Sequence, residues 1–199
     1  INFTEDVMRF KVTVGLSNKH VHLSKEHIDI LFGEGYELTP IKDLTQPGQF
    51  ACDEKVDLVG PKRTIKGVRI LGPARKETQV ELSFSDGFTL GITDLPVRDS
   101  GKTEGTPGLK LVGPKGEVEI ERGAIAAARH LHMHTTDAEK YGLKDKDIVS
   151  VKVDGQRGLV FDNVLVRVNE AYALDMHVDI EEGNAAGLKN GDLVEVIVE

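Results

Sequence analysis

Short runs of alternating apolar and polar residues, separated by turn-forming residues, constrain the fold of this 199-residue chain more than any other feature. Alternation with period two buries one face of a β-strand and exposes the other. Twenty-one glycines and an aromatic content of only 5% fit tight connections between short strands. Many short strands with few helices predict a mainly β fold made of barrels or sandwiches. The clearest runs are 10–14, 66–70, 78–82, 117–120, 148–153 and 193–198.

Helices are expected to be few and short. Ser24 is a good N-cap for a first helix that runs through Phe32 and ends at Gly33. Residues 124–128 form a second stretch of helical composition. A third helix is expected to begin with Thr136 or Asp137 as its cap and to end at Tyr141.

An internal repeat sharpens the prediction of barrels. Residues 142–151, Gly-Leu-Lys-Asp-Lys-Asp-Ile-Val-Ser-Val, match residues 187–196, Gly-Leu-Lys-Asn-Gly-Asp-Leu-Val-Glu-Val. Each copy indicates a helix end, a turn and a strand. Two copies indicate two halves of one small barrel, because a solenoid needs at least three repeats. A weaker repeat, Val-Gly-Pro-Lys, occurs at 59–62 and again at 112–115, in the middle of the chain. We therefore place one barrel in the C-terminal third and another in the middle of the chain.

Composition excludes several classes of function. The chain has 25 Lys and Arg against 33 Asp and Glu, a formal net charge of −8, whereas binding duplex nucleic acid requires a basic surface. No apolar run approaches the roughly 20 residues that span a bilayer, and no signal peptide is visible. The single cysteine, Cys52, excludes an internal disulfide and a thiolate zinc finger. We expect Cys52 to behave as an inert small apolar residue. We expect the protein to be soluble and cytoplasmic.

Clustered histidines point to metal chemistry. In a strand, a His-x-His pair places both imidazoles on the same face, where their nitrogens can converge on one ion. Two such pairs and a further histidine near the C-terminus predict a metal site for one or two ions, with zinc as a suitable metal. These five histidines are His20, His22, His130, His132 and His177.

Two further histidines are not among these five. His134 shares the strand face of His130 and His132, so it is an alternative ligand to either of them. His27 is expected on an exposed face of the first helix.

Five motifs resemble, in order, those of the propanediol-utilisation (PduL-type) phosphate acyltransferase family. The resemblance covers nearly the whole chain from about Phe10. Its N-terminal signature is Asn-Lys-His-Val-His-Leu-Ser at 18–24. The others are Leu-Gly-Pro-Ala-Arg at 71–75 with Gln-Val-Glu at 79–81, Arg-Asp-Ser-Gly at 98–101, Ala-Arg-His-Leu-His-Met at 128–133, and Asp-Met-His-Val-Asp at 175–179 with Glu-Gly-Asn-Ala-Ala at 182–186.

The resemblance implies two small β-barrels capped by short α-helices, with the metal site between them. It assigns residues 9–19 and 128–199, the first strand and the C-terminal third, to one barrel domain. It assigns residues 20–127 to the other, with a small inserted hairpin near 34–53.

The resemblance also implies the reaction: short-chain acyl-CoA, such as propanoyl-CoA or acetyl-CoA, and phosphate interconvert with acyl phosphate and CoA. Two divalent ions, usually zinc, would bind phosphate and activate the nucleophile. One ion would be held by His20, His22 and Glu81, and the other by His130, His132 and His177. Arg75 and Ser100 match positions that contact phosphate, and the CoA phosphates would meet cationic side chains such as Lys19, Arg129 and Lys102.

The residues themselves agree with this chemistry. Three protein ligands per ion leave a coordination position open, as in catalytic sites. Two adjacent cations suit phosphate and can generate a thiolate. The sequence offers no evident Ser-His-Asp or Cys-His nucleophile, so we expect no covalent acyl-enzyme. Two other hypotheses remain: a dinuclear zinc hydrolase of phosphoesters or thioesters, and a metal-stabilised scaffold module.

The family also suggests partners and location. Its members act freely in the cytoplasm or inside bacterial microcompartments, and we expect a homo-oligomer, a dimer being the simplest. The lead from Ile1 to Met8 shows no convincing amphipathic targeting helix, which favours the free form.

Overall fold

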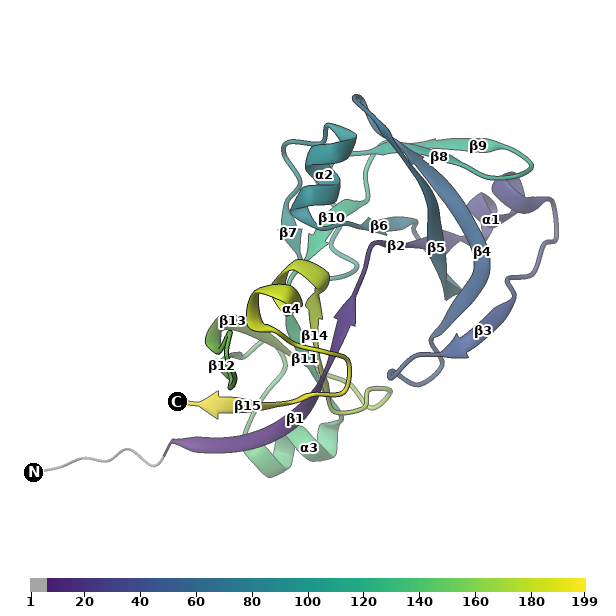
Figure 1. Ribbon diagram of the computed structural model, residues 1–199. Coiled ribbons are helices and arrows are strands. Elements are labelled where there is room, and N and C mark those ends of the chain that lie inside the picture. The colour runs from purple at the N-terminus through teal and green to yellow at the C-terminus, as the bar shows by residue number, and fades with distance from the viewer. Residues whose placement is uncertain (1–6) are drawn as a thin grey trace, which may run out of the picture. The chain divides into compact units, whose positions relative to one another are not determined.

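The computed structural model describes residues 7–199, so most of the lead from Ile1 to Met8 lies outside the described residues. Within that range the chain forms fifteen strands and four short helices (Figure 1). Its contacts divide it into two compact units. The barrel unit comprises the N-terminal part up to Ser17 together with Arg129–Glu199, and the sheet unit comprises Asn18–Ala128.

The barrel unit is a closed six-stranded barrel in which β1 lies between β14 and β15. Apolar residues of alternate strand positions fill its interior, among them Val14, Leu131, Met176 and Val196, each at most 1% exposed. In order around the barrel the strands are β1 (Met8–Ser17), β14 (Asp175–Asp179), β11 (His130–Met133), β13 (Leu159–Val168), β12 (Ile148–Val153) and β15 (Leu193–Val198).

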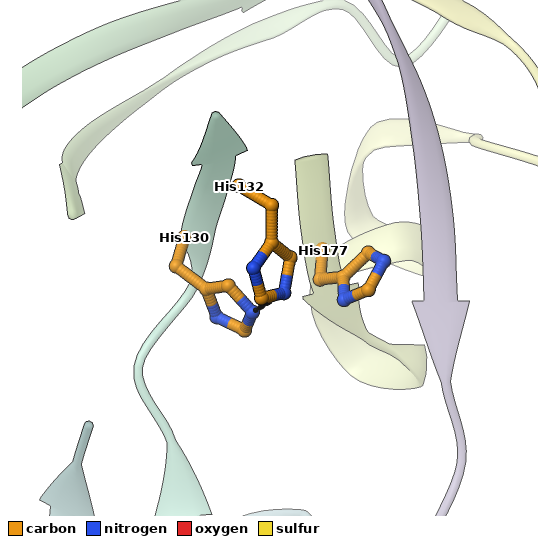
Figure 2. Close-up of side chains that lie close together, drawn as sticks. All are labelled: His130, His132 and His177. Carbon is orange, nitrogen blue, oxygen red and sulfur yellow. Dashed lines mark hydrogen bonds between the residues drawn. The ribbon is translucent and has the colours of Figure 1, made fainter. Parts of the chain in front are cut away.

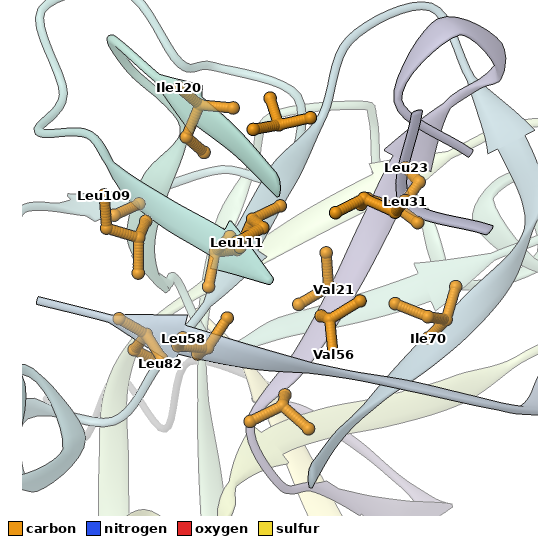
Figure 3. Packing of buried hydrophobic residues seen from close by; sticks show 14 of the residues in the cluster. Val21, Leu23, Leu31, Val56, Leu58, Ile70, Leu82, Leu109, Leu111 and Ile120 are labelled. Carbon is orange, nitrogen blue, oxygen red and sulfur yellow. The ribbon is translucent and has the colours of Figure 1, made fainter. Parts of the chain in front are cut away.

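The sheet unit is an open nine-stranded sheet, a half-barrel. Its core is a separate cluster of apolar side chains that includes Val21, Leu23, Leu58 and Ile70 (Figure 3). The path is β7 (Val97–Arg98), β10 (Ala124–Ala127), β6 (Gln79–Glu81), β2 (His20–Ser24), β5 (Thr64–Arg75), β4 (Phe50–Val59), β8 (Leu109–Val112) and β9 (Glu117–Ile120), with β3 (Pro40–Asp43) paired to β4. The prediction of a mainly β fold of barrels with short helices is confirmed.

All four helices follow the same local pattern. A short strand with alternating polar and apolar residues leads into a capping residue, and a helix of seven or eight residues begins directly after the cap. Each N-cap side chain accepts a hydrogen bond from a backbone N–H of the first turn, a group that has no partner within the helix. The helices, with their caps, are α1 (Lys25–Phe32, Ser24), α2 (Phe84–Leu90, Ser83), α3 (Thr135–Tyr141, His134) and α4 (Ile180–Ala186, Asp179).

The internal repeat is confirmed as two halves of one barrel. Gly142 and Gly187 end α3 and α4 with φ angles of 66° and 68°, in the left-handed region that glycine adopts without steric cost. In each following turn the aspartate accepts a hydrogen bond of 2.8 Å from the lysine N–H three residues earlier. The strands that follow, β12 and β15, are antiparallel neighbours.

One secondary-structure prediction is wrong. Residues 124–128 have helical composition, but Ala124–Ala127 is strand β10, parallel to β6 on one side and to β7 on the other. Both neighbours supply hydrogen bonds: Leu82 N–H donates to Ile125 O at 2.9 Å, and Ala128 N–H donates to Arg98 O at 2.8 Å. The helix propensity of alanine is worth only a fraction of a kcal/mol per residue, so tertiary pairing overrides it.

Two finer predictions also need correction. The first helix is Lys25–Phe32, capped by Ser24 and ended by Gly33 as expected. His27, however, is half-buried, and its Nδ1 is hydrogen-bonded to Thr78 Oγ1 at 2.6 Å. The third helix is capped by His134 instead of Thr136 or Asp137: the His134 Nδ1 accepts from Thr136 N–H at 3.1 Å. Among the described helices, none is long and apolar enough to cross a membrane.

The capping box of α2 yields a prediction about stability. Ser83 Oγ accepts from Asp86 N–H, and the Asp86 carboxylate accepts from Ser83 N–H, both at 3.1 Å. Replacing Ser83 with alanine should lower the free energy of unfolding by about 1 kcal/mol, because an orphan N–H of the helix loses its acceptor. Urea denaturation measures this. The control is Ser85→Ala on the exposed surface of the same helix; equal stability of the two variants would contradict the prediction.

Candidate metal centres

The first candidate centre lies on the sheet unit, where β2 and β6 pair antiparallel. His20 is directly opposite Glu81, and His22 is directly opposite Gln79. Val21 and Leu23 point into the apolar core (Figure 3). Because successive side chains of a strand point to opposite faces, the four polar side chains gather on the other face.

The spacing of these side chains suits a metal ion. His20 Nε2 lies 3.1 Å from His22 Nε2 and 2.9 Å from Glu81 Oε2, and His22 Nε2 lies 3.7 Å from Glu81 Oε1. Zinc bonds of 2.0–2.1 Å in tetrahedral geometry separate ligand atoms by about 3.3 Å. The three side chains therefore need only small shifts to hold such an ion.

The second candidate centre has the same construction on the barrel unit. On the antiparallel strands β11 and β14, His130 is opposite His177, and His132 is opposite Asp175. Figure 2 shows the rings of His130 and His132 meeting, with the ring of His177 beside them. His130 Nε2 and His132 Nε2 are 2.9 Å apart, and one ligand atom from each of the three histidines lies within 4.8 Å of the others.

The charge state of His132 favours metal binding. Its side chain is 5% exposed. Burial lowers the pKa of His132, the nearby imidazoles of His130 and His177 act in the same direction, and together they bring it to about 2. Within the described part of the chain, its Nδ1 is buried and has no hydrogen-bond partner. A buried imidazole that stays neutral at pH 7 can bind a metal without first losing a proton.

The two histidines of the first centre have pKa values shifted in opposite directions. Burial lowers the pKa of His22 to about 4. Burial also acts to lower the pKa of His20, but the charge and hydrogen bond of Glu81 outweigh it and raise that pKa. Burial opposes ionisation of Glu81, yet the charge of His20 and hydrogen bonds from His20 and His22 hold its pKa well below the usual range. Glu81 therefore stabilises positive charge beside it, as a carboxylate ligand of a metal ion would.

Each candidate centre has a fourth side chain that is hydrogen-bonded to the third residue of the group. The Asp175 carboxylate is 3% exposed; its Oδ2 lies 2.9 Å from His177 Nε2, and its Oδ1 accepts from Thr13 Oγ1 at 2.7 Å. A Cβ at Gly15, the strand partner of His177, would lie 3.3 Å from the His177 ring. In the sheet unit, Gln79 Nε2 donates to Glu81 Oε1 at 2.9 Å.

The two residues expected to contact phosphate also lie together. Arg75 ends β5, and its Nη1 donates to Ser100 Oγ at 3.1 Å. Both residues are half-buried in the sheet unit. This arrangement places a guanidinium fork and a hydroxyl side by side, a combination that suits an oxyanion.

The cationic residues expected to meet CoA have partners of their own. Lys19 Nζ lies 3.4 Å from Asp86 Oδ1. Arg129 forms an ion pair of 2.9 Å with Glu182 and donates from Nε to Asp162 O at 2.8 Å. Lys102 lines a pocket of about 440 Å³ on the sheet unit, together with Arg98, Arg122 and four other residues.

The six side chains that the family resemblance assigned to metal ions lie together in these two groups. No role was predicted for Gln79 or Asp175 from the sequence. Gln79 lies two positions before Glu81 in β6, and Asp175 lies two positions before His177 in β14. That spacing was visible in the sequence. Nothing in the sequence alone, however, shows which residue lies across the strand pair.

His134 does not belong to the second group. Its Nδ1 is engaged in capping α3, as described above. Although His134 lies two residues after His132, its side chain caps the helix that follows the strand.

The low pKa of His132 predicts acid sensitivity of the metal-free protein. The folded state keeps this imidazole neutral down to about pH 2, whereas the unfolded chain protonates it at about pH 6.5. Between those values the unfolded state binds more protons, so the free energy of unfolding falls as the pH falls. Between pH 8 and pH 5, the free energy of unfolding of His132→Gln should fall by about 2 kcal/mol less than that of the unsubstituted protein. Urea denaturation of chelated samples tests this; parallel stability curves would contradict it.

Comparison with known proteins covers both units. The family model described as phosphate propanoyltransferase matches residues 13–189. The phosphate propanoyltransferase of Thermotoga maritima is 59% identical over 187 residues, which are 94% of this chain and 89% of that protein. Those of Rhodopseudomonas palustris and Clostridioides difficile are 53% and 50% identical over 94% of this chain, and over 82% and 88% of their own lengths. Matches of this extent show that the chain belongs to the phosphate propanoyltransferase family.

Proposed function

We propose that this protein is a phosphate acyltransferase that interconverts short-chain acyl-CoA and phosphate with acyl phosphate and CoA. Propanoyl and acetyl groups are the substrates we infer, the first from the names of the relatives. The observation that carries the proposal is the pair of three-residue groups, His20–His22–Glu81 and His130–His132–His177, each of which could hold a metal ion. Three ligands leave a position for substrate, which distinguishes a catalytic site from a structural one.

Metal ions bound there would supply a positive charge for phosphate oxygens and would stabilise a thiolate at neutral pH. The residues of the chain bind and orient the reactants. Arg75 presents a planar fork of N–H donors to the phosphate, and Ser100 adds a hydroxyl. A phosphate oxygen attacks the thioester carbonyl, a C–O bond forms, and the C–S bond breaks with release of the CoA thiolate.

Direct transfer without an acyl-enzyme is supported by the state of the candidate nucleophiles. Ser100 Oγ accepts hydrogen bonds from Arg75 Nη1 and from Gln79 Nε2. Both are donors, so neither can remove the serine proton as a general base. Cys52 is fully buried, and burial raises the pKa of its thiol to about 11, which disfavours the thiolate.

We further propose that the two metal groups act in one dinuclear centre, with zinc as the most suitable metal. The all-histidine group suits zinc, cobalt or nickel, and the mixed group adds one carboxylate oxygen. A dinuclear arrangement would share the charge of one phosphate between two cations.

The remaining partners are proposed on the family resemblance and on charge. Lys19, Arg129 and Lys102 are our candidates for contacts with CoA phosphates. We propose a homodimer in the cytoplasm, either free or within a bacterial microcompartment. Light scattering measures the oligomeric state directly.

The first test is thioester formation. Protein loaded with zinc, mixed with CoA and propanoyl or acetyl phosphate, should produce a thioester absorbance that requires CoA and that is abolished by chelation. The absence of thioester, despite two bound ions per chain, would overturn the proposal. Phosphate release without CoA would then indicate a dinuclear hydrolase. No turnover, together with unfolding on chelation, would indicate a metal-stabilised scaffold module.

A second test asks whether the two groups serve one reaction. His22→Ala and His132→Ala should each reduce kcat by at least a hundredfold, and the double variant should be little worse than either single one, because residues that act as a unit are non-additive. Metal analysis of each variant accompanies the rates. His27→Ala, outside both groups, is the control. A single variant that loses its ion but keeps its rate would contradict a shared centre.

A further inference from the structure

Gln79 is a buried polar side chain whose hydrogen bonds connect both parts of the proposed site on the sheet unit. It is 1% exposed and stands opposite His22 on the strand that carries Glu81. Its Nε2 lies 2.9 Å from Glu81 Oε1 and 3.0 Å from Ser100 Oγ. Its Oε1 accepts from Gly101 N–H at 2.7 Å.

The backbone fixes which way the Gln79 amide faces. A backbone N–H can only donate, so the atom opposite Gly101 N–H must be the amide oxygen. The NH2 group therefore faces Glu81 and Ser100, and it has one hydrogen for each.

This orientation determines the role of the Ser100 hydroxyl. Its oxygen accepts from Gln79 Nε2 and from Arg75 Nη1. A hydroxyl has two acceptor lone pairs and one donor hydrogen, so with both lone pairs engaged its hydrogen must be directed elsewhere. Ser100 is therefore prepared to donate a hydrogen bond to an oxyanion that lies beside Arg75.

We infer that Gln79 is a positioning residue that fixes the Glu81 carboxylate and, through Ser100, the phosphate-binding pair. The inference rests on the proposed function, since that proposal assigns Glu81 to the metal and Ser100 to phosphate. Gln79 itself touches neither substrate nor metal. It determines which oxygen of Glu81 is already hydrogen-bonded and in which direction Ser100 donates.

The chemistry of the position explains why an amide suits it. A carboxylate at position 79 would lie within hydrogen-bonding distance of the Glu81 carboxylate and would repel it. It would also accept the Ser100 hydrogen and withdraw it from the phosphate. A methionine would fill a similar volume but would donate to neither neighbour.

The test measures phosphate binding separately from chemistry. In the metal-loaded protein, Gln79→Met and Gln79→Glu should each raise the KM for phosphate by about tenfold or more, because Ser100 would no longer be held to donate its hydrogen bond to the anion. The KM for acyl-CoA should change less than threefold. Titration of phosphate into the cobalt-loaded protein, followed through the visible cobalt spectrum, should show the same loss of affinity without turnover. Gln46→Met is the matched control, because Gln46 is also a buried glutamine of the sheet unit, 2% exposed.

A double-variant cycle separates positioning from a merely structural effect. If Gln79 acts on phosphate through Ser100, adding Gln79→Met to Ser100→Ala should raise the phosphate KM by less than threefold beyond Ser100→Ala alone. Fully additive effects, or a KM unchanged in Gln79→Met, would overturn the inference. If Gln79→Met does not fold, Gln79→Glu, which keeps the size and the Gly101 contact, decides the question alone.

Failure of the proposed function would look different. If Arg75→Ala and Ser100→Ala both leave the phosphate KM unchanged, phosphate does not bind at this pair, and the inference falls together with the assignment. If those two variants weaken phosphate binding and the Gln79 variants do not, only the inference is wrong.

Discussion

Antiparallel pairing of two short strands within each unit is the constraint from which both candidate centres arise. On β2 and β6, and again on β11 and β14, apolar residues at alternate positions enter a core. The same alternation sends four polar side chains to the opposite face. A slip of one residue in either register would send those side chains into the core. The apolar packing of each unit therefore holds its group of candidate ligands in place.

The fourth side chain on each face differs in a way that follows from the third ligand. Glu81 is a carboxylate, and it accepts a hydrogen bond from the amide of Gln79. His177 is an imidazole, and its partner is the carboxylate of Asp175, an acceptor. In both cases the partner offers the complementary half of a hydrogen bond. Partners of this kind fix the orientation of a ligand and tune its basicity. One strand pattern thus accommodates two different ligand sets.

How much of this could be predicted depends on whether the signal is local. The His-x-His pairs, the strand alternation and the helix from Ser24 to Gly33 depend on neighbours in sequence, and all were predictable. Gln79 and Asp175 gain their roles from a cross-strand register that the sequence does not display. The helix predicted at 124–128 was wrong for the same reason. This stretch is a strand because it pairs with β6 and β7, which are remote in sequence.

The two candidate metal-binding groups lower the stability of the fold when no ion is bound to them. The His132 Nδ1 is buried without a partner among the described residues, and such an atom costs about 1–3 kcal/mol. The imidazoles of His22 and His132 are kept neutral by burial, which weakens the fold in acid. The closed barrel and the core of the sheet unit must offset these costs. The same neutrality leaves ring nitrogens with lone pairs available to a cation, so the features that weaken the metal-free protein are those that would make metal binding favourable.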